Sequence, residues 1–363
     1  MNIKILSEPK IILQNSMSHH NFFAWPTVTR LKNGKIAVVS SGFRLKHICP
    51  FGKAIISFSE DEGESYSLPA PVIDTPLDDR DGGILAFGES GVIVTSFNNS
   101  KSFQKMIADE DKANEYIYGY INTLTDEDEE KYLGSTFRVS FNNGTSFGPL
   151  YRCPVTSPHG PLERENGDII WVGRTFSHDD SFRHTDKVCA FRIDIKNGSS
   201  EFLGVIDDIY IDGEKALSCE PHAIELPGGR LLTHIRVQQN NEKKTFTIFQ
   251  SISDDGGKTW SKPIQLLEDL GGAPAHIIRH SSGALISAYG YRSMPYGIKV
   301  MISLDNGESW EKDHRLYTSD ISSDLGYPAT VELNDGTLLT VFYASPEKSA
   351  PNAIMQVKWK LEE

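Results

Sequence analysis

The chain has 363 residues, 39% of them hydrophobic and 23% charged, which fits an ordinary globular protein. Its formal net charge of −13 argues against nucleic acid or an anionic membrane as a partner, because both would repel an acidic surface. No stretch approaches the roughly 20 apolar residues that a membrane-spanning helix needs, and no apolar run near the start is typical of a signal peptide. We therefore expect a cytoplasmic protein, although removal of a leader would allow secretion.

One pattern recurs six times: an apolar strand, a turn that contains glycine, and a second apolar strand. The first copy is Leu31 to Ile36, and the clearest is Leu333 to Leu339, where Asp335-Gly336 suits the positive φ of a tight hairpin turn. Successive turn glycines lie 53 to 76 residues apart, at Gly34, Gly91, Gly167, Gly229, Gly283 and Gly336. Six copies at this period predict an all-β fold, a single six-bladed β-propeller over residues 1–363.

Two other segments have places in this fold. The longest gap between turns holds a charged insertion at about residues 100–133, in the second blade, which we expect to be partly helical. Within it, Thr125 to Glu129 is typical of a capped, acidic helix start. Near the ends of the chain, Ile11 to Asn15 and Ile354 to Leu361 are extended segments that we expect to pair in one blade and close the ring.

A second repeat supports the first. Ser59 to Tyr66 fits the pattern Ser-x-Asp-x-Gly-x-Ser/Thr-aromatic, as do Ser253 to Trp260 and Ser303 to Trp310, while Ser140 to Phe147 has Asn in place of Asp. In such a turn the Asp side chain bonds turn amides, the glycine supplies positive φ and the aromatic residue packs between strands. The motif predicts a structural turn between outer strands, since the ligand series of a calcium loop is absent. With these Asp-boxes and the six hairpins, nearly the whole chain resembles the sialidase superfamily.

Hairpin geometry predicts where the functional residues gather. Each inner strand leaves one face and the next strand returns to it, so residues seven to ten places on either side of a turn glycine are expected around one mouth at the axis. Before the turns these positions hold Trp25, Thr27, Asp81, His159, Glu220, His222, His276 and Tyr327. After the turns they hold Arg44, Asn98, Arg174, Arg236, Arg292 and Tyr343.

Four of these residues are arginines: Arg44, Arg174, Arg236 and Arg292. A guanidinium group keeps its charge when buried, so each needs a carboxylate partner or an anionic ligand. Salt bridges to Asp81 and Glu220 are one interpretation. We favour a ligand carboxylate held by two parallel hydrogen bonds, because that geometry suits arginine best.

The resemblance to sialidases implies roles for individual residues. Cys219-Glu220-Pro221-His222 followed by His234-Ile235-Arg236 is similar to the Glu and Arg of the fourth blade, and Tyr327 before Asp335-Gly336 sits where sialidases place a nucleophilic Tyr. Arg292 is similar to the fifth-blade member of the arginine triad, Arg44 to the Arg that ends the second strand of blade one, and Asp81 to an Asp of the second blade. By this resemblance Tyr327 attacks, Glu220 takes its proton, and Arg236 and Arg292 hold the substrate anion.

The sequence departs from sialidases at two places. Sialidases begin with Phe-Arg-Ile-Pro, but this chain has Phe23-Ala24-Trp25-Pro26, so Ala24 replaces the first triad arginine. The loop after the first blade's second strand, which supplies an acid/base Asp in sialidases, offers His47 and no carboxylate. We interpret both departures as a changed sugar specificity, with Trp25 stacking on the ring. The general acid is then Asp81, which we rank first, or His47 or a neighbouring histidine.

Three histidines could in principle hold zinc: His159, His222 and His276. We favour hydrogen bonds to sugar hydroxyls or loops, because the blades spread these residues around the ring. The four cysteines lie far apart without metal-type spacing, at Cys49, Cys153, Cys189 and Cys219, and we expect reduced thiols. We therefore expect no metal and no cofactor.

The sequence predicts a glycoside hydrolase that acts on an acidic sugar, sialic acid-like or uronic, with retention of configuration through Tyr327. Three alternatives stay open. Asp81 and Glu220 could act as a carboxylate pair on another acidic sugar, the propeller could bind carbohydrate without catalysis, or it could be a polysaccharide lyase on uronate-containing glycans. The sugar, the linkage and the oligomeric state stay open as well.

Overall fold

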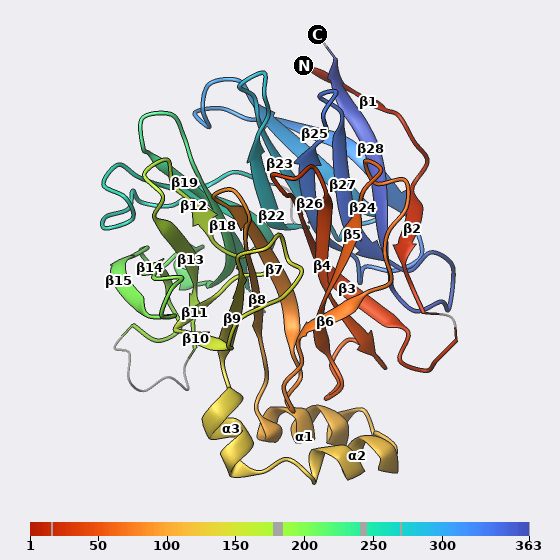
Figure 1. Cartoon of the computed structure of the whole chain (residues 1–363). Coiled ribbons are helices and arrows are strands. Elements are labelled where there is room, and N and C mark those ends of the chain that lie inside the picture. Colours follow the sequence, from red (N-terminus) through yellow and green to blue (C-terminus); the bar gives the residue numbers. More distant parts are fainter. Residues whose placement is uncertain (16, 177–183, 240–244, 269–270, 363) are drawn as a thin grey trace.

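The computed structural model describes residues 1–362 except 16, 177–183, 240–244 and 269–270. Six of its antiparallel sheets are arranged as the blades of one propeller (Figure 1). In five blades the strands follow one another from the axis outward in chain order, as the hairpin repeats predict, and the last blade adds strands from the start of the chain at its outer side. The predicted six-bladed, all-β fold is confirmed.

The first three blades come from residues 22–205. Blade one contains β3 (Phe22–Arg30), β4 (Ile36–Arg44), β5 (Lys53–Ser59) and β6 (Ala70–Ile73). Blade two contains β7 (Arg80–Phe87), β8 (Gly91–Phe97), β9 (Ser135–Ser140) and β10 (Tyr151–Cys153). Blade three has a broken inner strand and contains β11 (Val155–Thr156), β12 (Leu162–Glu163), β13 (Ile169–Thr175), β14 (Val188–Ile193) and β15 (Ser200–Val205).

The other three blades follow a small hairpin of β16 (Tyr210–Ile211) and β17 (Glu214–Lys215). Blade four contains β18 (Leu217–Glu225), β19 (Leu231–Gln238), β20 (Phe246–Ser253) and β21 (Ile264–Gln265). Blade five contains β22 (Gly272–Arg279), β23 (Leu285–Tyr291), β24 (Tyr296–Ser303) and β25 (Glu311–Ser319). Blade six contains β26 (Gly326–Glu332), β27 (Leu338–Ala344), β28 (Ala353–Glu362), β1 (Asn2–Ile5) and β2 (Lys10–Leu13).

Blade six closes the ring with strands from both ends of the chain. The pairing of β2 with β28, Ile11 opposite Met355, confirms the predicted closure. In addition β1 pairs with the far end of β28, Ile3 opposite Leu361, so both termini emerge together in Figure 1. The pairing of β1 and β2 covers the outer edge of β28, which would otherwise be open to unwanted strand pairing.

The cores lie between neighbouring blades, so the middle strands are buried on both faces. Trp359 of β28 is fully buried, and its indole N–H donates a hydrogen bond to Thr340 Oγ1 at 2.8 Å. A buried indole N–H left without an acceptor would cost about 1–3 kcal/mol, so this bond lets a large ring pack between blades.

The Asp-box turns have the predicted hydrogen bonds. In the first box the Asp61 carboxylate accepts from the Ser65 N–H at 2.8 Å and from the Ser59 hydroxyl at 2.8 Å. Gly63 follows with a φ of 83°, which a glycine adopts without a Cβ clash. The boxes at Asn142, Asp255 and Asp305 repeat the arrangement. Each one joins an outer pair of strands and lies away from the mouth.

The insertion between β8 and β9 forms three helices, α1 (Lys101–Glu110), α2 (Glu115–Ile121) and α3 (Asp126–Tyr132). The acidic helix start predicted at Thr125 is present, with Thr125 and Asp128 capping each other's backbone N–H groups. Figure 1 shows the helices together beyond the strands, at the end opposite the termini. None of the helices in the described part of the chain is long and apolar enough to cross a membrane.

Candidate active site

Four inner strands share one backbone irregularity where they begin. Trp25, Asp81, Glu220 and Tyr327 all have φ between 47° and 54°, and the strand pairing shifts register at each of them. Non-glycine residues adopt this left-handed conformation at a cost of about 1–2 kcal/mol, and surrounding structure must hold them there. The bulge at each of these residues turns its side chain toward the mouth of the axis, so the four side chains lie in one layer.

Tyr327 lies at the centre of a polar cluster. Its hydroxyl donates to Glu220 Oε1 at 2.8 Å, while Arg236 donates to Glu220 Oε2 at 2.6 Å and to the Tyr327 oxygen at 3.0 Å. Burial and the Glu220 charge raise the pKa of Tyr327 well above its ordinary value, although Arg236 and Arg292 oppose the shift. Tyr327 is therefore a neutral phenol in the resting protein, with a carboxylate placed to receive its proton.

The two arginines lie beside one aromatic ring. The guanidinium carbon of Arg236 is 4.7 Å from the centre of the Phe246 ring, and that of Arg292 is 5.3 Å from it. Burial alone would lower the pKa of Arg236, but Glu220 and Tyr327 raise it well above its ordinary value. Arg292 donates to Tyr343 Oη at 3.2 Å and lies 6.0 Å from the Tyr327 ring centre. Two fixed positive charges beside a neutral phenol suit an anionic ligand.

His47 approaches the same cluster from the loop after β4. Its Nδ1 lies 3.2 Å from Asp324 Oδ1, and its ring meets the Trp25 ring edge-on at 4.9 Å. The Asp324 carboxylate also accepts from the Tyr343 hydroxyl at 2.8 Å and from Asn352 Nδ2 at 3.0 Å, so three partners hold it. The His47 side chain is 44% exposed. It is thus an oriented imidazole with access to solvent at the mouth.

Asp81 is the most deeply placed acid of the mouth, only 4% exposed. Burial and then the Glu220 charge raise its pKa to about 7, against the opposing effect of Arg80 and Arg44. Arg80 lies next to it, with Arg80 Nε 3.9 Å from Asp81 Oδ1 and the guanidinium over the Trp25 ring at 4.2 Å. Neither Arg80 Nε nor Asp81 Oδ1 has a hydrogen-bond partner in the described chain. Both are buried polar atoms left without a hydrogen-bond partner, which is uncommon in a folded protein.

Two predicted substrate-binding residues are covered. Arg44 is fully buried and pairs with the equally buried Asp78 at 2.6 Å, so its charge is satisfied inside the protein. Trp25 is only 1% exposed, because His47, Arg80 and Tyr327 pack around its ring. The prediction that Arg44 binds a ligand and that Trp25 stacks on a sugar is corrected. Both residues support the side chains that line the mouth.

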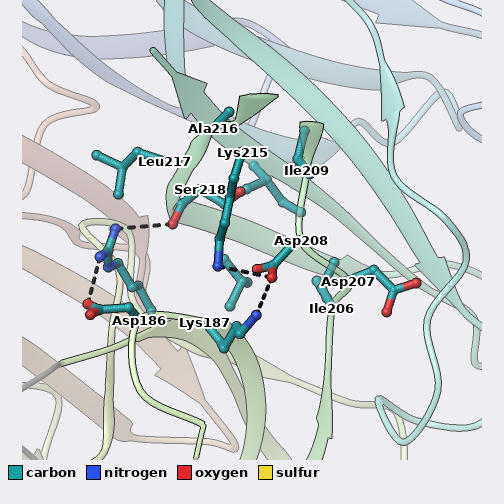
Figure 2. A pocket seen from close by; sticks show the side chains of 13 residues that line it. Asp186, Lys187, Ile206, Asp207, Asp208, Ile209, Lys215, Ala216, Leu217 and Ser218 are labelled. Atoms are coloured by element: carbon teal, nitrogen blue, oxygen red, sulfur yellow. Dashed lines mark hydrogen bonds and ion pairs between the residues drawn. The ribbon is translucent and has the colours of Figure 1, made fainter. Parts of the chain in front are cut away.

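Arg174 lies in a separate pocket of about 270 Å³ between blades three and four. It donates to Asp186 Oδ1 at 2.7 Å and to the Ser218 carbonyl at 3.5 Å. Figure 2 shows that pocket, where Lys187 and Lys215 both approach Asp208. Each of these cations has a carboxylate partner, and Arg174 is not grouped with Tyr327. No contact in the described part of the chain joins Arg174 to Tyr327, so its place among the arginines of the mouth stays a prediction.

The three predicted histidines gather below the mouth. Neighbouring ring centres are 4.4 to 5.6 Å apart, and the exposure of His159, His222 and His276 is 1–7%. Each lies seven or eight places before its turn glycine, whereas Glu220 and Tyr327 lie nine before theirs. His222 and His276 line a cavity of about 640 Å³ that continues to Glu225 and Glu332, near the hairpin turns. The histidines therefore do not line the sugar pocket as expected.

Metal binding by these histidines receives no support. Among the residues that the structure describes, no three His, Cys, Asp or Glu side chains are grouped as metal ligands. The backbone N–H of Ile277 donates to His222 Nδ1 at 3.0 Å, and that of Thr330 to His276 Nδ1 at 3.2 Å. These bonds tie neighbouring inner strands together. The four cysteines form no disulfide.

Sequence reasoning missed several residues of the site. Asp324 orients His47, Phe246 supports both arginines, and Arg80 covers Trp25. Tyr343, which the hairpin geometry placed at the mouth without a role, accepts a hydrogen bond from Arg292. Asp324 lies three places before Tyr327, and Arg80 precedes Asp81, so proximity to a candidate was an available signal. Phe246 begins the third strand of its blade, and no pattern in the sequence pointed to it as a site residue.

The comparisons with known proteins agree with this fold. Residues 159–340 match the model of the BNR repeat-like domain, which is half of the chain. The chain belongs to the BNR repeat-like family. The matched region contains two of the Asp-boxes, at Asp255 and Asp305, and the strands that hold Glu220 and Tyr327. Among curated proteins, none matches the sequence.

Solved structures place this BNR repeat protein among sialidase-like propellers. A Dyadobacter fermentans protein of unknown function is 19% identical, with a TM-score of 0.78 over 99% of this chain and 100% of that one. The NanB sialidase of Streptococcus pneumoniae is 14% identical, with a TM-score of 0.67 over 97% of this chain and 70% of that one. The intramolecular trans-sialidase of Ruminococcus gnavus is also 14% identical, with a TM-score of 0.66 over 96% and 97%.

Proposed function

We propose that this protein is a retaining glycoside hydrolase that acts on an acidic sugar, with Tyr327 as nucleophile and Glu220 as its base. The observation that carries the proposal is the hydrogen bond of 2.8 Å from the Tyr327 hydroxyl to Glu220, beside two arginines. A phenol paired with a carboxylate is the nucleophile–base arrangement of covalent catalysis. The sialidase and trans-sialidase with similar folds support the same class of reaction.

In the first step, the Tyr327 oxygen attacks the anomeric carbon while its proton passes to Glu220 Oε1. The glycosidic bond breaks, and a general acid protonates the departing oxygen. In the second step, water attacks the anomeric carbon, the bond to Tyr327 breaks, and the proton on Glu220 returns to the phenol oxygen while the acid recovers its own proton from water. Two displacements at the same carbon retain its configuration.

A neutral nucleophile suits an anionic sugar. A carboxylate nucleophile would repel a sugar that carries its own carboxylate near the reacting carbon. The phenol of Tyr327 has no charge and gains a negative one only as its proton moves to Glu220. Arg236 and Arg292 would bind the sugar carboxylate, because guanidinium groups match its geometry. Arg80 supplies a further buried cation near Tyr327, in a chain where Ala24 replaces the first triad arginine.

For the general acid, the geometry favours His47 over Asp81. The pKa of Asp81 is raised to about 7, but its side chain is only 4% exposed and lies beside Arg80. His47 is 44% exposed at the mouth, and Asp324 fixes the orientation of its ring. A leaving group departs toward solvent, so His47 is better placed to protonate it. Asp81 would instead bond a sugar hydroxyl with its unpartnered oxygen.

The test is a panel of fluorogenic glycosides that includes α-sialosides, uronides and neutral hexosides. We expect turnover of one acidic glycoside and its loss, by at least 10³-fold in kcat, in Tyr327→Phe. The matched control is Tyr66→Phe, which removes a tyrosine hydroxyl that donates to Gln356 at 2.7 Å in an outer Asp-box. Undiminished turnover in Tyr327→Phe would contradict the proposal. Binding of an acidic sugar with no turnover of any glycoside would indicate a non-catalytic propeller.

A further inference from the structure

We propose that Gln104, on helix α1 of the insertion, is a positioning residue that holds His47 in place through Asp78 and Arg44. These side chains form a buried chain of contacts that ends on the His47 carbonyl oxygen. The inference rests on the proposed function and deepens it, because it gives the insertion the task of fixing the proposed general acid.

The loop that carries the proposed acid is attached to the insertion. Residues 45–52 lie between β4 and β5 and belong to no strand. Two apolar side chains of this loop, Leu45 and Phe51, pack against the small apolar core of α1 and α2. Lys46 forms an ion pair with Asp111, the residue that follows α1. The position of the loop therefore depends on the inserted helices as well as on its own blade.

A fully buried ion pair connects α1 to this loop. Gln104 is 2% exposed, and its Nε2 donates to Asp78 Oδ2 at 2.9 Å. The other oxygen of that carboxylate lies 2.6 Å from Arg44 Nη2, and both side chains of the pair are closed to solvent. Arg44 Nη2 then donates to the His47 carbonyl oxygen at 3.1 Å, and Arg80 Nη1 donates to the same oxygen at 3.2 Å. Two guanidinium groups therefore fix the His47 main chain.

The Asp78 carboxylate depends on Gln104 for hydrogen bonding. In the described part of the chain Gln104 gives this carboxylate its one hydrogen bond, since Asp78 Oδ1 has the ion pair with Arg44 but no aligned donor. Removal of the donor leaves a buried carboxylate oxygen unsatisfied, which is costly, so the carboxylate has to turn or shift toward another donor. Arg44 is paired with it and shifts as well.

The same residues hold both ends of the loop. Arg44 precedes the loop, and its Nη1 donates to the Asp79 carbonyl oxygen at 3.3 Å. Gly52 ends the loop, and its carbonyl oxygen accepts from the Asp79 N–H at 3.1 Å. A side chain at Gly52 would overlap Arg44 and Asp78, so the chain passes directly against the ion pair. Because the packing is close, a shift of the pair is transmitted to His47.

The position of His47 matters for leaving groups that need a proton. A shift of about 1 Å in a reacting group can lower a rate by about 100-fold. Among the described residues, Gln104 makes no hydrogen bond to Tyr327 or Glu220, whose contacts lie across the mouth. Loss of Gln104 should therefore slow the glycosides that depend on the acid and spare those that do not. A purely structural role would slow both kinds alike.

The test is Gln104→Met, which keeps the length of the side chain and removes the donor. With the acidic sugar found by the panel, we expect kcat for the methyl glycoside to fall about tenfold and kcat for the nitrophenyl glycoside to stay within about twofold. In His47→Gln, adding Gln104→Met should change neither rate further, because residues that act through one group are not additive. Equal losses for both glycosides, no loss, or a further loss in His47→Gln would overturn the proposal.

The matched control is Tyr120→Phe. It also removes a hydrogen bond between the insertion and the segment before β7, from the Tyr120 hydroxyl to the Pro76 carbonyl oxygen at 2.9 Å. We expect both rates to stay at the wild-type value, and the same selective loss in Tyr120→Phe would overturn the role given to Gln104. If Gln104→Met does not fold, Gln104→Asn, which draws the donor back by one carbon, takes its place.

The crystal structure of Gln104→Met separates this proposal from the proposed function. We expect His47 to have moved away from Asp324 and the hydrogen bond between Tyr327 and Glu220 to be intact. An unmoved His47, in a protein that hydrolyses acidic glycosides, would overturn the positioning role alone. A displaced His47 in a protein that hydrolyses no glycoside would overturn the proposed function and, with it, the catalytic meaning of the displacement.

Discussion

At the scale of single residues, the Glu220 carboxylate is shared between a phenol and a guanidinium, at 2.8 Å from Tyr327 Oη and 2.6 Å from Arg236. In Glu220→Gln the amide keeps the shape and cannot take the proton. We expect kcat to fall by about 10²–10⁴-fold, the range for loss of a general base, with KM changed only a few-fold. Steady-state kinetics on the best glycoside of the panel measure this.

The matched control for that variant is on the same strand. Glu225 accepts from Arg164 Nε at 2.8 Å at the other end of β18, so Glu225→Gln also removes a carboxylate from an arginine pair. We expect Glu225→Gln to lower thermal stability and to leave kcat unchanged. A similar loss of kcat in both variants would show that the effect comes from blade four as a whole, against the role given to Glu220.

The assignment of the acid makes its own prediction. A phenol leaves as a stable anion and needs little protonation, whereas a sugar alcohol needs a proton from the acid. In His47→Gln we therefore expect kcat for sugar leaving groups to fall at least 100-fold and kcat for nitrophenyl glycosides to fall less than tenfold. If Asp81→Asn shows this selective loss and His47→Gln does not, the acid is Asp81.

At the scale of elements, the Asp-box turns serve stability. The Asp61 pKa is lowered, chiefly by hydrogen bonds from Ser65, so the turn favours the ionised carboxylate. We expect Asp61→Ala to lower the free energy of unfolding, because the turn loses its hydrogen bonds to the carboxylate, with no change in KM. Urea denaturation measures the first and kinetics the second. Glu60→Ala, next to it and exposed, should change neither.

The same elements show how far sequence reasoning reaches. The turn glycines and Asp-boxes specify blades, because hairpins need positive φ and an Asp-bonded turn at fixed places. They do not specify how far along the propeller axis each inner-strand side chain lies. Glu220 and His222 lie two places apart on β18, so strand alternation puts them together, but the bulge between Cys219 and His222 separates them. Glu and Tyr do not favour a positive φ, so nothing in the sequence indicated this bulge.

The partners of the arginines could not be predicted from the sequence either. The sequence shows that Arg44, Arg174, Arg236 and Arg292 end their strands, but their partners depend on loops folded from distant segments. Arg44 forms an ion pair with Asp78, and Arg174 forms one with Asp186, while Arg236 and Arg292 both lie over the ring of Phe246. Sequence alone could therefore identify the four arginines, but it could not show which of them lie together at the candidate site.

At the scale of the whole molecule, the axis below the mouth is filled with neutral imidazoles. Burial lowers the pKa of His222 and His234 to about 3 and lowers those of His159 and His276 well below their ordinary value. The unfolded chain binds protons on them below about pH 6.5, and the folded protein does not. Their stabilising contribution is therefore complete above pH 6.5 and is lost as the pH falls toward 3.

We expect acid to destabilise the propeller through this layer. At pH 5 each such histidine lowers the free energy of unfolding by about 2 kcal/mol relative to neutral pH. His222→Gln should reduce the difference between pH 7.5 and pH 5 by about that amount, as measured by urea denaturation at both values. The exposed His19→Gln is the control. An unchanged pH dependence in His222→Gln would mean that the layer takes up its protons without unfolding.

The central claim is that six blades bring Tyr327 and Glu220 together as nucleophile and base. The most direct measurement is mass spectrometry of the protein after reaction with a fluorinated, activated glycoside of its acidic sugar, which forms the covalent intermediate faster than water removes it. The account predicts one added sugar on the peptide that contains Tyr327, and none in Tyr327→Phe. A sugar attached to Glu220 or Asp81 would contradict it, and so would turnover with inverted configuration and no label.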